Sequence, residues 1–222
     1  MKTHLIIPDC QVKPGVPIDH LRWAGNYAAE KKPDVIINIG DFADMPSLSS
    51  YDVGKKSFEG RTYQADVEAS RNGMALFVDP INTEINRLKY NKKKKWNPDK
   101  EFFLGNHEHR IDRAIENDRK LDGLISVDDL QYKEFGWNVH PFLEVGIIDG
   151  IAYSHYFTSG VMGRPVTSAR ALTTKKHMSC VMGHIQTTEI DMSQFRADGT
   201  PLISLFVGGF YQIGRASCRE RV

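Results

Sequence analysis

The stretch EFFLGNHEHRID (101–112) decides the fold that we predict for this chain. An apolar run that suits a buried β-strand ends at Gly105, and Asn106, His107 and Glu108 follow at once. A helical pattern begins only after these polar residues. In open α/β sheets, side chains that follow the carboxyl ends of strands line the ligand crevice. The order therefore predicts a strand, a functional loop and then a helix.

The same order occurs twice upstream. HLIIPD (4–9) and DVIINIGD (34–41) are apolar runs that end in Asp9 and Asp41. Helical patterns cover 18–32, 64–90 and 109–125, with an interruption expected near Pro80. Beyond residue 125 we expect hairpins, including a tight turn at Asp149 and Gly150. The sequence predicts an α/β fold, a layered α/β/β/α sandwich of mixed sheets, in one domain spanning 1–212.

Composition excludes several classes of protein. The chain has 222 residues, 41% of them hydrophobic, which is enough for a full core. Lys and Arg number 29 against 28 Asp and Glu, so no overall field attracts nucleic acid or an anionic membrane. Three cysteines and no signal-like start favour a reducing, cytoplasmic location without membrane association. The oligomeric state stays open.

The last ten residues, IGRASCRERV (213–222), break with this pattern. They resemble translated vector read-through more than native protein, so we expect a non-native tail there and different native residues after Tyr211. A native basic tail is the alternative.

Polar residues of the ligand type follow five of the expected strands. They are Asp9, Gln11, Asp41, Asp44, Asn106, His107, His155, His184 and Gln186. A carboxylate flanked by other oxygens and by imidazoles is the usual arrangement for hydrolysis at two metal ions. A helix N-cap is the simpler reading of each acid taken alone.

Five segments together resemble the calcineurin-like metallophosphoesterase family. They are DCQ (9–11), GDFAD (40–44), GNHE (105–108), the histidine of AYSHYF (155) and GHIQ (183–186). The family pattern reads D-x-H, G-D-x-x-D, G-N-H-[DE], H and G-H-x-H. The resemblance implies a hydrolase with two divalent ions, Mn²⁺ foremost and Mg²⁺, Zn²⁺ or Fe as alternatives. It implies attack of a metal-bound hydroxide on a phosphate ester.

The resemblance also implies a role for each matching residue. Asp41 would bridge the two ions; Asn106, His155 and His184 would complete one site, and Asp9, Gln11 and Gln186 the other. His107 would protonate the leaving oxygen, oriented by Glu108 or Asp44, and Arg110 would grip the phosphate. We expect Gly105 to permit the sharp exit from its strand.

Two departures from the family pattern affect the function. Gln11 and Gln186 stand where the family has histidines, so the first site offers oxygen donors alone. Such a site should prefer harder ions and hold them loosely. Met45 and Pro46 follow GDFAD in place of the arginine and glycine of phosphoprotein phosphatases, which makes that activity less expected.

Three functions remain open at this point. A phosphodiesterase or nuclease acting on DNA or RNA is favoured by Lys92 to Lys95, with Tyr90 and Trp96 as stacking candidates. A phosphomonoesterase, or an esterase of small cyclic phosphates, would need a closed pocket. An inactive scaffold of the same fold is the third, although intact GNHE argues against it.

Overall fold

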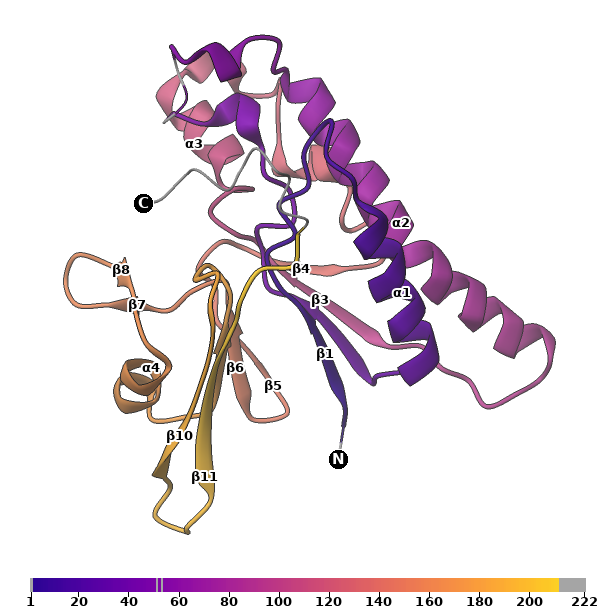
Figure 1. The fold of residues 1–222 in the computed structure, drawn as a ribbon, viewed down its shortest axis with the longest axis vertical. Coiled ribbons are helices and arrows are strands. Elements are labelled where there is room, and N and C mark those ends of the chain that lie inside the picture. Colours follow the sequence, from indigo (N-terminus) through magenta and orange to yellow (C-terminus); the bar gives the residue numbers. More distant parts are fainter. Residues whose placement is uncertain (1, 51, 53, 212–222) are drawn as a thin grey trace.

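The structure, a computed structural model, describes residues 2–50, 52 and 54–211 and contains two larger sheets (Figure 1). The first sheet has four strands in the order β1-β2-β3-β4, and all three pairings are parallel. Its strands are β1 (His4–Ile7), β2 (Val35–Asn38), β3 (Asp99–Phe103) and β4 (Asn138–His140). Because these strands run the same way, the loops that follow them meet at one edge of the sheet.

The second sheet is mixed, with the order β10-β11-β9-β6-β5. Its strands are β5 (Gly146–Ile148), β6 (Ile151–Ser154), β9 (Cys180–Met182), β10 (Thr188–Phe195) and β11 (Pro201–Val207). β9 pairs in parallel with β6 and β11, whereas β5 and β10 are antiparallel to their neighbours. A short ribbon of β7 (Thr158–Ser159) and β8 (Arg164–Pro165) lies apart from both sheets.

Three apolar clusters hold these parts together. Helices α1 (Asp19–Lys31) and α2 (Tyr63–Tyr90) pack through Ala28, Met74 and Ile81 on Ile36 and Phe102 of the first sheet. The alternate strand residues Val35, Ile37 and Phe103 pack against Tyr153 and Val181 of the second sheet. Helix α4 (Ala169–Lys176) covers the other face of the second sheet through Ala169 and Leu172, packed with Cys180 and Phe206. The α/β class is confirmed, and one sheet is parallel while the other is mixed.

Helix α2 contradicts the expected interruption, because it runs through Pro80 without a break. A proline inside a helix costs about 3 kcal/mol through its missing N–H and its ring. Buried residues on both sides of it, including Phe77 and Ile81, belong to one cluster that offsets this cost. Tertiary packing therefore overrides the local signal.

The third helix is shorter than the predicted 109–125. Helix α3 spans Arg110–Asn117, and the chain leaves it at Asp118, whose side chain accepts a hydrogen bond from the Lys120 backbone. Short 3-10 turns occupy several loops. They are η1 (Pro46–Leu48), η2 (Lys56–Phe58), η3 (Arg119–Leu121) and η4 (Val127–Leu130).

The hairpin prediction beyond residue 125 is confirmed for three antiparallel pairs, β5 with β6, β7 with β8 and β10 with β11. Asp149 and Gly150, with φ of 50° and 82°, form the turn between the paired Ile148 and Ile151. β4, however, belongs to the first sheet, and the parallel pairing of β6 with β9 requires a crossover, which contains α4. Helix α4 and strand β10 were not predicted, because α4 has only eight residues and β10 has exposed apolar side chains.

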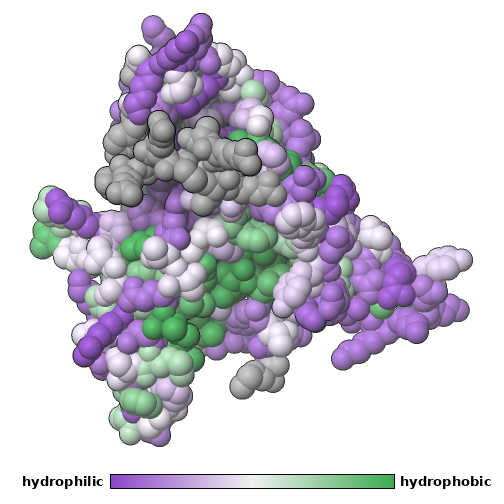
Figure 2. Space-filling view, in the orientation of Figure 1, coloured by the Kyte–Doolittle hydropathy of each residue, from purple (hydrophilic) through white to green (hydrophobic). Residues whose placement is uncertain are grey.

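The core between the sheets reaches the surface at one side. Figure 2 shows hydrophobic surface in the middle of the view, between the hairpin of β10 and β11 and the strand β1 of Figure 1. Exposed apolar side chains on the two C-terminal strands include Ile190, Met192, Phe195 and Ile203. β1 and β10 are both edge strands, so no further strand covers this side within the described residues.

Of two predictions about the whole chain, one can be compared with the structure and one cannot. Among the described residues, every helix is too short or too polar to traverse a lipid bilayer. The expected non-native tail, 213–222, lies outside the described residues.

His20 gives the fold a pH-sensitive point. Its side chain is buried in α1 against the Phe210 ring, 5.1 Å between centroids, and neither ring nitrogen has a hydrogen-bond partner of good geometry within the described residues. Burial lowers its pKa, and the Phe210 backbone and Asp19 offset this only in part. The folded state therefore holds a neutral imidazole.

We predict that acid destabilises the protein partly through His20. Because its folded pKa lies below the unfolded value of about 6.5, its contribution is present above that pH and lost as the pH falls below it. Urea unfolding at about pH 7.5 and pH 5.5 should show a smaller loss for His20→Leu than for the wild type. The control is His177→Asn, an exposed histidine at a left-handed position that asparagine tolerates. Equal acid losses in the wild type and His20→Leu would contradict this role.

Candidate metal centre

Two glycines bring the loops after β2 and β3 into backbone contact. A side chain on Gly40, whose φ is 94°, would meet the Gly105 nitrogen and the Phe103 oxygen, both at 2.7 Å. A side chain on Gly105 would collide with the Asp41 backbone nitrogen and carboxylate. Gly105 does not have a positive φ, so it permits the exit from β3 through the close approach that its lack of a side chain allows, and not through a left-handed backbone conformation.

The buried carboxylate of Glu108 fastens the same two loops. It accepts hydrogen bonds from the backbone nitrogens of Asp41 at 3.0 Å, Ala43 at 2.8 Å and Gly105 at 2.9 Å. The side chain is 0% exposed, and the Tyr132 hydroxyl lies 3.5 Å away. Glu108 therefore fixes where Asp41 and Asn106 point.

Four side chains converge above this scaffold. Ligand atoms of Asp41, His155 and His184 all lie within 4.8 Å of one another. The Asn106 Oδ1 atom lies between the two rings, 2.9 Å from His155 Nε2 and 2.8 Å from His184 Nδ1. We call Asp41, Asn106, His155 and His184 the metal cluster. They come from the loops after β2, β3, β6 and β9, which both sheets deliver to one place.

The hydrogen bonds of His155 indicate a cation. Its Nδ1–H donates to the Ile39 carbonyl at 2.8 Å, so its Nε2 faces Asn106 Oδ1 and, at 3.4 Å, Asp41 Oδ1. A neutral ring would point its lone pair at two oxygens. Burial disfavours a charged ring, but the Asp41 carboxylate outweighs this and raises the pKa of His155 to about 9. A divalent ion would satisfy the same atoms without that extra proton.

Asp9 provides a second sign of a missing positive charge. It is 0% exposed; its Oδ1 accepts a 3.2 Å hydrogen bond from the His184 backbone, while Oδ2 has no partner within the described residues. Burial, and then the nearby Asp41 carboxylate, raise the pKa of Asp9 to about 7. A buried acceptor without a donor is costly, and a cation removes the cost. The residues present therefore fit a metal ion.

His107 lies next to the metal cluster and is held by Asp44. Its backbone nitrogen donates to Asp41 Oδ1 at 2.9 Å, and its Nδ1 lies 2.8 Å from Asp44 Oδ1. Lys13 binds the other Asp44 oxygen at 2.8 Å. Burial would lower the pKa of His107, but Asp44 and Asp41 outweigh it and raise the value. Its Nε2 is the ring atom left to face a substrate.

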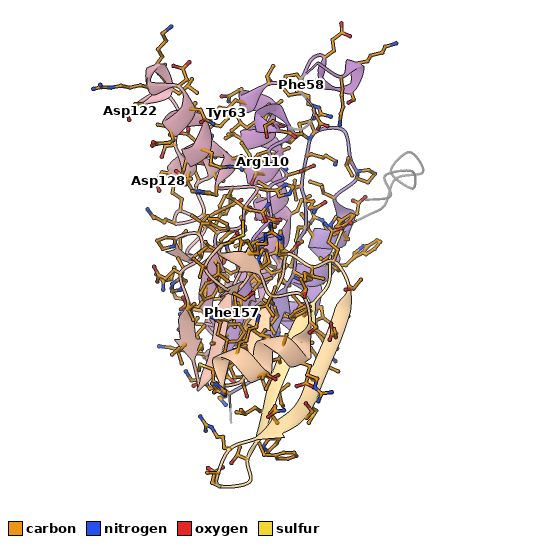
Figure 3. All side chains as sticks on the ribbon, turned by 90° about the vertical axis from the view of Figure 1, so that its left-hand side faces the viewer. Phe58, Tyr63, Arg110, Asp122, Asp128 and Phe157 are labelled. Atoms are coloured by element: carbon orange, nitrogen blue, oxygen red, sulfur yellow. The ribbon has the colours of Figure 1, made fainter. Side chains whose placement is uncertain are left out.

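The geometry chooses between the two alternatives for the partner of His107 and does not show the expected role of Arg110. Asp44, and not Glu108, contacts the His107 ring, because all of Glu108's hydrogen bonds go to the loop scaffold and Tyr132. Arg110, central in Figure 3, donates through Nη1 to the Asp44 and Met45 carbonyls, and its Nη2 lies 3.3 Å from His107 Nε2. Its guanidinium thus braces the loop and the histidine. The two-pronged grip on phosphate expected for Arg110 is not preformed.

The glutamines are not gathered around a first metal in the way the resemblance implies. Gln186 is exposed, and its Oε1 accepts a 2.6 Å hydrogen bond from the Tyr211 hydroxyl. Gln11 has a positive φ of 46°, and its backbone nitrogen donates to the Asp41 carbonyl, but its carboxamide makes no hydrogen bond within the described residues. Of the three residues implied for the first metal site, Asp9 is therefore the one whose buried carboxylate could bind the ion together with Asp41.

Sequence reasoning missed three neighbours of the site. Tyr211 is placed there by the Phe210 nitrogen, which donates to the Asp9 carbonyl at 2.7 Å. The Tyr156 ring lies 4.8 Å from the His184 ring, and Lys13 pairs with Asp44. Tyr156 follows His155 in AYSHYF, but the family pattern specifies only the histidine there. Lys13 and Tyr211 lie outside the matched segments, so the pattern held no signal for any of the three.

Strained backbone conformations accumulate at the site. Gln11, Asp41, Met45 and His184 all have φ between 46° and 62°, a region that residues other than glycine rarely adopt. Such strain costs about 1–3 kcal/mol per residue and persists where the surroundings enforce it, often at functional sites.

Comparison of the sequence with protein-family models and with curated proteins gives no match.

We predict that Glu108→Ala lowers the free energy of unfolding by about 3 kcal/mol or more. The substitution leaves three buried backbone donors without an acceptor, each worth about 1–3 kcal/mol. Urea unfolding with excess chelator separates this effect from metal binding, and Glu116→Gln on the exposed side of α3 is the control. A loss below about 1 kcal/mol would show that Glu108 does not hold the loops.

We predict that Asp41→Asn and His155→Ala each weaken Mn²⁺ binding at least about tenfold, since even residues behind the ligands change affinity by about 10–100-fold. Equilibrium dialysis with metal analysis measures this. The matched control is Asp99→Asn, an exposed aspartate at the opposite end of the first sheet. Unchanged affinity in both variants would remove the metal cluster as the binding site.

Proposed function

We propose that this chain is a metal-dependent phosphoesterase of the calcineurin-like metallophosphoesterase family, with the layered sandwich of that family. The observation that carries the proposal is the metal cluster beside the His107–Asp44 pair. Two imidazoles, a carboxylate and an amide oxygen suit Mn²⁺, Zn²⁺ or Fe. The strand-end positions of DCQ, GDFAD, GNHE and GHIQ support the family assignment.

We expect one ion to be held firmly and a second loosely. Asp41, Asn106, His155 and His184 supply four ligand groups for the first. Asp9 and Asp41 would supply carboxylate oxygens for the second ion. Gln186 would not contribute, because its Oε1 already accepts a hydrogen bond from the Tyr211 hydroxyl. When bound, such ions supply Lewis acidity that stabilises charge on phosphoryl oxygens and activates water.

The chain's own contribution to the reaction is a proton. Asp44 accepts from Nδ1 of His107 and fixes the ring, so Nε2 is the atom that can protonate a leaving oxygen. Arg110 Nη2, 3.3 Å from that nitrogen, has to yield its place to the substrate. Lys13 neutralises the remaining charge on Asp44.

The position of the lysine run in the fold does not support a nucleic-acid substrate. Lys92 to Lys95 and Trp96 connect α2 to the start of β3, and the Trp96 indole donates to the Pro33 carbonyl before β2. This loop projects from the end of the sheet opposite the metal cluster (Figure 1). We therefore propose a small phosphodiester as the substrate, with nucleic acid as an alternative outcome of the assay.

We predict that His107→Ala lowers kcat by about 10²–10⁴-fold, the range for loss of a general acid, while bound Mn²⁺ per chain stays unchanged. Hydrolysis of bis-p-nitrophenyl phosphate and metal analysis on the same sample test this. If the variant loses its metal but keeps its activity per bound ion, the role assigned to His107 is wrong.

The same assay, run with p-nitrophenyl phosphate and with single-stranded and double-stranded DNA, tests the substrate class. Preference for the small diester supports the proposal. Cleavage of DNA would identify a nuclease, preference for the monoester a phosphomonoesterase, and no turnover with metal bound a scaffold.

A further inference from the structure

A cavity of about 540 Å³ lies beside the metal cluster, between α3, η4 and the segment after β4. Its described lining includes no member of the metal cluster. The volume lies in the range of about 300–1,000 Å³ that is usual for small-molecule sites. In Figure 3, Asp128 marks this flank of the molecule and Arg110 lies toward the centre.

The cavity and the metal cluster share a wall. His109, two residues after His107, lines the cavity and stacks on Phe142, which also lines it, with 4.6 Å between centroids. The Phe142 ring lies 5.6 Å from that of Tyr156 and 6.4 Å from that of His155. One aromatic ring therefore separates the cavity from a metal-cluster residue. An ester group that reaches past Phe142 from a phosphate at the metal centre would enter this cavity.

The lining is apolar on its walls and rich in acceptors at its rim. Leu104, Val139 and Phe142 supply apolar surface. The carboxylates of Asp112, Asp128 and Glu134 stand at the rim, against one lysine. That lysine, Lys133, is paired with Asp128 at 2.8 Å, and His109 is paired with Asp112 at 3.0 Å. A ligand there must bring its own donors.

Glu134 is the rim acceptor most available to a ligand. It is exposed, and within the described residues its carboxylate has no hydrogen bond or ion pair. The Gln131 carboxamide, also in the lining, likewise makes no side-chain hydrogen bond there. The excess of carboxylates in the lining disfavours a second phosphate group in the cavity, because the like charges would repel one another.

We propose that this cavity binds the ester group of the substrate, and that this group is a compact or flat unit with N–H donors, such as guanine or a primary ammonium. The inference rests on the proposed function and names its substrate class. A flat donor-bearing group buries its faces against the apolar walls and donates to the rim carboxylates, with Glu134 and Asp112 as principal acceptors. Pyrimidines rich in carbonyl groups fit poorly, because their acceptors would face carboxylates.

Binding without metal tests the cavity alone. In excess chelator, calorimetric titration should give a dissociation constant for guanosine at least tenfold lower than for uridine. Glu134→Gln and Phe142→Ala should each weaken guanosine binding at least fivefold. The matched control, Glu116→Gln, changes a carboxylate on the same helix as Asp112 but outside the lining, and should have no effect.

Ethanolamine in the same titration separates the two donor sources. Ethanolamine binding that Glu134→Gln abolishes, without guanosine binding, supports the ammonium form of the proposal. Three outcomes would overturn the proposal. They are equal binding of guanosine and uridine, binding of neither guanosine nor ethanolamine, and binding of both guanosine and ethanolamine to Glu134→Gln as tightly as to the wild type.

Turnover connects the cavity to the metal centre. With Mn²⁺, kcat/KM for the p-nitrophenyl ester of guanosine 5′-phosphate should exceed that of the thymidine ester at least tenfold if the base is guanine. Glu134→Gln should abolish this preference, whereas the control Glu116→Gln, outside the lining, should keep it. If guanosine or ethanolamine binds in the cavity but no ester is hydrolysed, the proposed function is wrong and the inference about the ligand of the cavity still holds. If esters are hydrolysed but neither compound binds, this inference is wrong and the proposed function still holds.

Discussion

The buried carboxylate of Glu108 is the interaction on which the site depends. Its two oxygens collect backbone donors from the loops after β2 and β3, which lie more than sixty positions apart in sequence. A carboxylate that is 0% exposed is tolerated when several donors satisfy it. Because Gly40 and Gly105 let these loops touch, Glu108 can bind both at once. Asp41 and Asn106 then have fixed positions, and the strained backbone of Asp41 is held in place.

Fixed acceptors without enough donors give the site its chemistry. Asp9 keeps one buried oxygen without a partner, and His155 turns Nε2 toward two oxygens. Each is expensive in a protein interior, and a cation bound at that group relieves the cost. In the His107–Asp44 pair beside them Nδ1 is satisfied by Asp44, and Nε2, 3.3 Å from Arg110 Nη2, is the nitrogen left for proton donation. The division between unsatisfied ligands and a satisfied proton donor supports the hydrolytic function proposed above.

Sequence patterns succeeded where the signal is local and failed where packing decides. The three strands that end in Asp9, Asp41 and Asn106 were predicted nearly in full, because apolar runs bounded by glycine or acid depend on few residues. The break at Pro80 was wrong because buried residues on both sides hold α2 together. The hairpin prediction for the C-terminal half was incomplete, because β9 inserts in parallel between β6 and β11, a pairing that local periodicity does not encode.

The sequence by itself determined the α/β class and the order of the polar strand ends, because strand periodicity and terminal residues are local properties. Tertiary structure decided which polar residues meet. In the folded chain Glu108 accepts hydrogen bonds from the backbone, Asp44 contacts the His107 ring, and Gln186 accepts a hydrogen bond from Tyr211. The lysine run lies at the far end of the sheet. These outcomes follow from side-chain direction and close approach between distant segments, which residue types in a linear order do not specify.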